Sequence, residues 1–413
     1  MCQYIDLPPE IRIMITDYLA LPDLKSYATS CRSFSREALL RLWEKIHISP
    51  HLQGGEGIVA VVNTLLLDPI KASYVRQVRI TTTYLGSGSP TTIFPHHTES
   101  ADDPFWPRLT AALRLLVNLK AMTLFLLAPP SIKQEIPPQT QKMIKCLIDS
   151  HIKTVRFLRS SLPTQPLIEL FQAWPGLRAV VIHEYRSPRD IVLPEILPNI
   201  RRIQAYPPWL EHLVPGRPIE QIFVPPTTLE HERSRPYVEK LNRVISHCPS
   251  LKHLRMHRVP ILGETVLLSF SHSGITTLEL VLCIHESIAR DTASSLVTVA
   301  LHGIIGGFPS LCALRVVYSH SKLPGSMKFP PPLDDASSHD AQFINRCRGA
   351  FDELVISTDH KALRSIRVEI CPSTSRVSEG LWINAERTEL LGWEVLAGVG
   401  DGRELPELAA DDP

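Results

Sequence analysis

The sequence has no excess of charge of either sign. Lys and Arg total 43 and Asp and Glu total 42, so the formal net charge is +1. General nucleic-acid binding and binding to acidic membranes normally need a basic excess, which this chain lacks. We therefore expect neither a nucleic-acid partner nor a membrane partner.

Closely spaced cysteines and long apolar runs are also missing. The eight cysteines form no C-x-x-C motif, which excludes a zinc ribbon and a dense disulfide framework. The N-terminus lacks the basic and apolar regions of a secretory signal, and apolar stretches such as 121–130 are shorter than the ~20 residues that span a bilayer. We expect a cytoplasmic or nuclear protein with reduced thiols.

Motifs that carry chemistry are absent as well. The sequence has no G-x-x-x-x-G-K-[ST] loop, no G-x-S-x-G elbow and no H-E-x-x-H helix. The nearest group of metal-ligand types is His247, Cys248, His253 and His257. His253 and His257 would share a face only on a helix, whereas they fall on and beside a predicted strand. We predict that the chain is not an enzyme and holds no metal or cofactor.

The 36 prolines are the unusual feature of a composition that is otherwise ordinary for a globular protein. They are scattered, so they predict many short elements. In the first fifty residues, proline and acidic signals delimit three short amphipathic helices. Pro8, Pro9 and Glu10 begin the first, Leu21-Pro22 ends it, and Asp23 caps the second; the third carries Leu39, Leu42, Trp43 and Ile46. Periodicity alone also fits a helical cap on a larger domain.

The same residues resemble the F-box. The matching pattern is Leu7-Pro8-x-Glu10-Ile11, then Ile15, Tyr18-Leu19, Asp23-Leu24, Tyr27, Cys31-Arg32-x-Phe34 and Leu42-Trp43. Tyr27 is a mild departure, because many members have Leu there. The resemblance covers about a tenth of the chain.

This resemblance implies docking on the Skp adaptor of an SCF (Skp–cullin–F-box) ubiquitin ligase, and through it on a cullin. The residues that would form the adaptor-facing and core surface are Leu7, Pro8, Ile11, Ile15, Leu19 and Leu24. Some of these six must build the module's own core, since three short helices bury little apolar area.

A six-residue pattern, apolar-x-x-apolar-x-apolar, recurs through the remaining chain. It occurs at 75–80, 119–124, 152–157, 177–182, 200–205, 219–224, 251–256, 275–280, 311–316 and 363–368. Chance would give about six such windows, so the count alone decides little. However, four windows follow a proline two residues earlier, and helical stretches at 105–118, 141–150, 166–174 and 236–248 lead into several of the ten windows.

These regularities predict helix–turn–strand units and resemble an irregular leucine-rich repeat. The expected fold is α/β: an F-box at 1–50, a leucine-rich-repeat-like solenoid at 51–400 with long loops at 86–104 and 322–340, and an acidic tail at 401–413. A doubly wound α/β domain is the alternative, although no Gly-rich phosphate loop accompanies the strands.

The predicted function is substrate recognition in an SCF-type ubiquitin ligase. The alternatives are a bridging scaffold that acts without ubiquitination and an enzyme whose active site is assembled from scattered residues. Position five of each six-residue window should face the exposed side of the sheet and is rich in arginine. An acidic or phosphorylated protein segment would suit such a face, unless these arginines only solvate strand edges. The predicted substrate-binding residues are Arg79, Arg156, Arg255, Arg315 and Arg367.

Overall fold

The computed structural model describes most of the helices and strands of the chain. The described residues are 7–30, 32–48, 56–82, 105–126, 138–184, 196–225, 235–260, 272–284, 307–320, 362–372, 381–388 and 392–399. The predicted loops at 86–104 and 322–340 and the predicted tail at 401–413 lie outside these residues. The chain divides into two compact units, which change over near residue 200.

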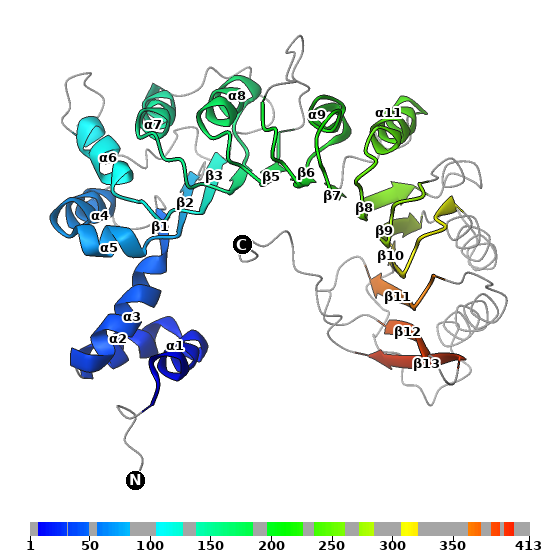
Figure 1. Ribbon diagram of the computed structural model, residues 1–413, viewed down its shortest axis with the longest axis horizontal. Coiled ribbons are helices and arrows are strands. Elements are labelled where there is room, and N and C mark those ends of the chain that lie inside the picture. Colours follow the sequence, from blue (N-terminus) through cyan, green and yellow to red (C-terminus); the bar gives the residue numbers. More distant parts are fainter. Residues whose placement is uncertain are drawn as a thin grey trace. The chain divides into compact units, whose positions relative to one another are not determined.

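Unit 1 alternates helices with parallel strands. Its elements are α1 (Pro9–Tyr18), α2 (Leu21–Ser30), α3 (Arg32–Glu44), β1 (Lys45–Ile48), α4 (Glu56–Leu67), α5 (Pro69–Tyr74), β2 (Gln77–Thr82), α6 (Phe105–Arg114), β3 (Ala121–Leu126), α7 (Pro138–Asp149), β4 (Phe157–Ser160), α8 (Thr164–Ala173) and β5 (Ala179–Ile182). Strands β1 to β5 pair in parallel and in chain order. Helices α6, α7 and α8 cover one face of this sheet (Figure 1).

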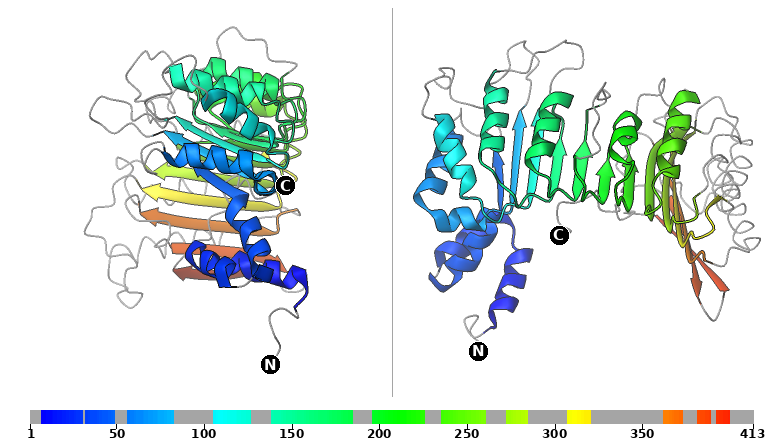
Figure 2. Two further views of the ribbon diagram at one scale, coloured as in Figure 1. Left: turned by 90° about the vertical axis from the view of Figure 1, so that its left-hand side faces the viewer. Right: turned by 45° about the horizontal axis from the view of Figure 1, so that its top comes forward.

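Unit 2 continues the alternation and then ends in antiparallel strands. Its elements are β6 (Arg202–Gln204), α9 (Pro207–Leu213), β7 (Gln221–Val224), α11 (Arg235–Ser246), β8 (His253–Pro260), β9 (Thr277–Ile284), β10 (Ala313–His320), β11 (Ser365–Pro372), β12 (Leu381–Thr388) and β13 (Gly392–Val399). Strands β6 to β11 pair in parallel and in chain order, whereas β12 and β13 are antiparallel. Figure 2 shows α9 and α11 on one side of the unit 2 strands.

The core of each unit lies between helices and sheet. In unit 1, Leu124, Leu158 and Val180 are completely buried on the helix-facing side of consecutive strands. In unit 2, Ile203 and the helical Trp209 are equally buried. Burying such side chains contributes about 1.5–3 kcal/mol each, which makes this layer the main source of stability.

The predicted mixed α/β fold with an N-terminal helical module is confirmed. The sequential strand order within each unit differs from that of a doubly wound domain, in which the chain reverses direction at a switch point. The doubly wound alternative therefore describes neither unit. Strands β12 and β13 were not predicted, because they lack the six-residue pattern.

One backbone contact recurs between neighbouring parallel strands, at the residue that precedes each strand. Within each unit, the residue before each parallel strand after the first donates its N–H to the carbonyl of the corresponding residue before the previous strand, over 2.7–2.9 Å. We name these residues the strand-entry ladder. Its members are Glu44, Arg76, Lys120, Arg156 and Arg178 in unit 1, and Arg201, Glu220, Lys252, Thr276, Cys312 and Arg364 in unit 2.

The ladder corrects one predicted register. At β4, Arg156 lies on the ladder and Arg159 pairs with Thr123. Position five of the six-residue window at this strand is therefore Arg159. The true window is 155–160, but its position six is Ser160, which is polar although fully buried. Because the pattern requires an apolar residue there, it matched 152–157 instead. The Ser160 hydroxyl accepts a hydrogen bond from the N–H of Leu162 at 3.0 Å, which satisfies it inside the core.

The third predicted helix also ends earlier than expected. Helix α3 stops at Glu44, and Ile46 lies in β1, opposite Val78. Helical spacing placed Ile46 on the helix because an apolar residue three positions after Trp43 fits either element. The N-terminal module therefore runs without a loop into the first strand of the unit 1 sheet.

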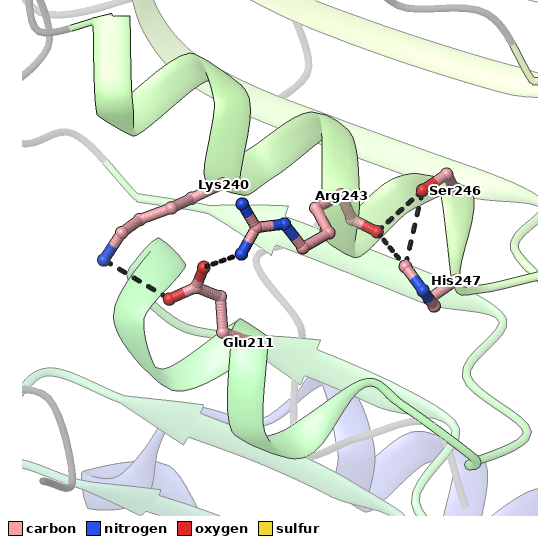
Figure 3. A network of polar contacts seen from close by, with 5 residues as sticks. All are labelled: Glu211, Lys240, Arg243, Ser246 and His247. Atoms are coloured by element: carbon pink, nitrogen blue, oxygen red, sulfur yellow. Dashed lines mark hydrogen bonds and ion pairs between the residues drawn. The ribbon is translucent and has the colours of Figure 1, made fainter.

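Polar contacts on the helical side fasten α9 to its surroundings. Glu211 on α9 contacts Lys240 at 3.3 Å and Arg243 at 3.8 Å on α11 (Figure 3). Beyond the end of α9, the buried Arg217 donates through Nη1 to the carbonyls of His212 and Pro215. A guanidinium at this point complements the negative end of the helix dipole.

We predict that Arg217→Ala lowers the free energy of unfolding by about 1–3 kcal/mol, because it removes a buried guanidinium and leaves the carbonyls of His212 and Pro215 without this donor. Urea denaturation of the full chain measures the change. The control is Arg243→Ala, since the Arg243 side chain is 66% exposed and its ion pair should contribute less than about 1 kcal/mol. Equal effects of the two substitutions would contradict the role assigned to Arg217.

Candidate partner-binding surfaces

The N-terminal module is a small three-helix bundle. Leu24 on α2 is 4% exposed and Ala38 on α3 is fully buried. An ion pair at 3.3 Å between Arg12 and Glu37 ties α1 to α3, and the hydroxyl of Ser35 donates to the carbonyl of Ala28. These contacts hold α1 on the bundle by one side and leave its other side open.

The open side of α1 carries an apolar stripe. Ile11, Met14 and Tyr18 are 41%, 55% and 88% exposed, and their spacing of three and four residues puts them on one helical face. We name these three residues the α1 stripe. Exposed apolar side chains grouped on a small module indicate a protein-docking surface.

The predicted adaptor residues fall into three groups. Pro8 and Ile11 are exposed, Leu7, Ile15 and Leu19 are half-buried, and Leu24 is buried in the bundle. Leu24 therefore belongs to the core of the module in this conformation. Met14 and Tyr18 were absent from the predicted set, although their positions three and seven residues after Ile11 could have revealed them.

The sheet face of unit 1 opposite its helices carries a row of position-five residues. Register aligns His47, Arg79, Thr123, Arg159 and Val181 across β1 to β5. The pKa of His47 lies below its ordinary value, chiefly because of burial and secondly because of the charge on Arg79.

Two of these arginines converge on an aromatic ring. The guanidinium carbons of Arg79 and Arg159 lie 5.6 and 5.0 Å from the centre of the Phe125 ring. Nε of Arg159 donates to Nε2 of His183 at 3.1 Å, and the His183 ring lies 5.3 Å from that of Phe125. We name Arg79, Phe125, Arg159 and His183 the arginine–phenylalanine cluster. It contains one predicted substrate residue, Arg79; Phe125, Arg159 and His183 were not predicted.

Arg156, which was predicted to share this face, lies elsewhere. Its Nη1 donates to the carbonyls of Lys153 and Gly176, at 3.1 and 3.2 Å, in the turns that precede β4 and β5. The assignment of Arg156 to the position-five row is wrong, because the predicted window at 152–157 is three residues out of register with β4.

The corresponding row of unit 2 is built around a buried acid. Register aligns Phe223, Arg255, Glu279, Arg315 and Arg367 across β7 to β11. We name these residues the Glu279 row. It contains three predicted substrate residues, Arg255, Arg315 and Arg367.

Glu279 neutralises much of the charge in its row. This residue is 3% exposed, and one of its carboxylate oxygens lies 3.2 Å from Arg255 Nε and 3.1 Å from Arg315 Nη1. The Arg255 guanidinium also lies 4.6 Å above the centre of the Phe223 ring. Position five of unit 2 is rich in arginine, but two of the three arginines in the Glu279 row are already paired with this carboxylate.

The group of metal-ligand types singled out in the sequence does not converge where it is described. His247 at the end of α11 bonds through Nδ1 to the carbonyl of Arg243, and the buried Cys248 thiol donates to the carbonyl of Ile219. Burial raises the pKa of Cys248 to about 11 and lowers that of His253. Within the described residues, no three His, Cys, Asp or Glu side chains come together as a metal site. None of the helices described here is long and apolar enough to cross a membrane.

A three-helix bundle that exposes an apolar helical stripe belongs to the class of small protein-docking modules. Residues 4–49 match the F-box-like family model. The N-terminal part of the chain is therefore an F-box-like domain, and the predicted resemblance to F-box proteins is confirmed for this part. The repeat resemblance of the remaining chain stays a prediction.

A search of curated proteins found no relative of the chain. Among solved structures, a sugar phosphate isomerase/epimerase from Parabacteroides distasonis ATCC 8503 is 11% identical, covering 77% of this chain and 97% of its own, with a TM-score of 0.16. A similarity at this TM-score carries no argument about fold or activity.

We predict that Glu279→Gln destabilises the protein by about 2 kcal/mol, because two neighbouring guanidiniums lose their shared carboxylate. Denaturation in urea measures the change, and adding Arg315→Gln should recover part of it. Glu220→Gln is the control, because the Glu220–Arg201 pair is 36% and 60% exposed and should be worth less than about 1 kcal/mol. A cost no larger than that of the control would show that Glu279 is not the centre of its row.

Proposed function

We propose that this protein is the substrate-recognition subunit of an SCF-type ubiquitin ligase. The F-box-like domain docks a Skp-type adaptor and thereby a cullin, and the remaining chain binds a protein substrate. In this role the chain performs no chemistry itself, but holds the substrate at high local concentration and in a fixed orientation. It would act in the cytoplasm or the nucleus.

The observation that carries the proposal is the F-box-like match at residues 4–49. The exposed α1 stripe supports it. F-box domains bind Skp-type adaptors, and burying Ile11, Met14 and Tyr18 against an apolar partner would supply favourable free energy. Aromatic residues such as Tyr18 are typical centres of protein interfaces. Leu7, just before α1, and Ile15, within α1, are half-buried and would extend the contact.

The proposed architecture of the rest is a leucine-rich-repeat-like solenoid within each unit. Parallel strands in chain order, helices on one face and the strand-entry ladder support this interpretation, because each repeat then contacts only its neighbours. The face without helices would be the substrate-binding surface. Of the predicted substrate residues, Arg79, Arg255, Arg315 and Arg367 lie in rows on this side.

The adaptor contact is tested by Ile11→Asp combined with Tyr18→Asp. These changes put charge into an apolar contact, so adaptor affinity should fall by about 30-fold or more in titration calorimetry. The matched control is Leu67→Asp with Ile70→Asp, which alters two apolar residues that are 85% and 64% exposed outside the F-box-like domain.

The control variant should bind the adaptor as the wild type does. Undiminished binding by the Ile11/Tyr18 variant would refute the assigned docking surface. If the wild-type chain binds the adaptor but no substrate is ubiquitinated in the reconstituted ligase, the scaffold alternative is favoured.

A further inference from the structure

The arginine–phenylalanine cluster has the properties of a preorganised anion site. Arg159 is held by the His183 ring and by the face of Phe125, and Arg79 lies over the same ring. Because an arginine Nε–H can only donate, His183 Nε2 must accept and is therefore unprotonated in this geometry. Holding these side chains in advance reduces the entropy that a ligand would otherwise have to overcome.

The surroundings of Arg79 distinguish this cluster from the Glu279 row. Arg79 is exposed, and among the described residues no carboxylate lies within ion-pair distance of it. Arg255 and Arg315, in contrast, already share Glu279. No acidic residue occurs in the row that runs from His47 to Val181. A new anion would therefore gain more at Arg79 than at Arg255 or Arg315.

The spacing of the two arginines restricts the ligand. Arg79 lies on β2 and Arg159 on β4, with β3 between them, so their backbones are about 10 Å apart. A polyproline II segment rises about 3.1 Å per residue with three residues per turn. Side chains three residues apart then share one face at a separation of about 9 Å. In a β-conformation, by contrast, side chains three apart point to opposite faces.

We infer that the arginine–phenylalanine cluster binds an extended acidic segment of a partner protein, with negative side chains three residues apart and an apolar residue between them. The two guanidiniums would each bind one carboxylate or phosphate, for which their fork geometry is suited. The apolar residue would contact Phe125. This inference rests on the proposed function, since the segment would belong to the substrate.

Fluorescence polarisation of labelled peptides on the full chain tests the inference. Four proline-rich peptides differ only at their centre: Asp-Pro-Leu-Asp, the rearranged Asp-Asp-Pro-Leu, the neutral Asn-Pro-Leu-Asn, and a form with phosphoserine in place of both Asp. The first should bind about tenfold more tightly than the second and third, and its affinity should fall between about 50 and 300 mM NaCl. Tighter binding of the phosphorylated peptide would identify phosphate as the preferred anion, and weaker binding would identify carboxylate.

Variants locate the binding site. Arg79→Glu with Arg159→Glu should weaken binding of the Asp-Pro-Leu-Asp peptide by about tenfold or more, and the corresponding Lys pair by less, because charge remains while the fork is lost. Arg178→Glu with Lys120→Glu is the matched control, since both side chains are exposed on the strand-entry ladder of the same unit. The control variant should bind within about twofold of the wild type at the higher salt concentration.

Adaptor binding, measured on the same samples, separates the two proposals and reports folding. If the wild type binds the adaptor but shows no preference for the spaced peptide, or if the Arg79/Arg159 variant keeps its peptide affinity, the inference about the cluster is wrong and the docking role stands. If the wild type does not bind the adaptor, the proposed function fails whatever the peptides do. Arg79→Glu alone, which changes an exposed residue, gives the same test if the double variant does not fold.

Discussion

The strand-entry ladder is the contact on which the rest of the structure depends. Each rung joins the residue before one strand to the residue before the next strand of the same unit, so it sets the register of that pair of strands. A shift of one residue would exchange the buried and exposed sides of a strand. The ladder therefore fixes which residues face the helices and which face the opposite side, and both candidate binding rows follow from it.

Register alone does not make a row of arginines into a binding surface. Like charges repel when they stand opposite each other on a sheet. The two units differ in how they reduce this repulsion. Unit 2 places Glu279 between Arg255 and Arg315 and so satisfies them internally. Unit 1 places two arginines beside an aromatic ring, which attracts cations without removing their charge. The first arrangement satisfies the arginines of unit 2 within the fold, whereas in the second, among the described residues, no carboxylate is paired with Arg79, which the proposed anion site requires.

Part of the fold was accessible from the sequence, because it depends on local patterns. Prolines, acidic helix starts and helical spacing identified the helices of the N-terminal module. The six-residue apolar windows identified strands in the rest of the chain. The pattern failed where tertiary contacts override polarity: the buried Ser160 occupies an apolar position because Leu162 supplies its hydrogen bond. The end of α3 was misplaced because Ile46 suits a helix and a strand equally well.

The candidate surfaces were less accessible, because they depend on neighbours in space. Counting residues at position five revealed an excess of arginine but not the pairing of Glu279, whose partners come from the two adjacent strands. Likewise, Phe125 and His183 join the cluster only once register aligns β3 and β5 with their neighbours. In α1, the F-box resemblance identified Ile11 as a docking residue, whereas the exposure of Met14 and Tyr18 depends on how α1 packs on the bundle.

The junction between the F-box-like domain and the sheet links docking to recognition. Helix α3 passes into β1 without a loop, and the carbonyl of Glu44 accepts the N–H of Arg76 at 2.9 Å as the first rung of the ladder. The ammonium group of Lys71 on α5 also lies 5.7 Å from the centre of the Trp43 ring on α3. A partner that holds α1 would therefore also orient the unit 1 sheet, because no flexible linker separates them. In the proposed function, such coupling would present a bound substrate segment in one direction, which ubiquitin transfer to that substrate requires.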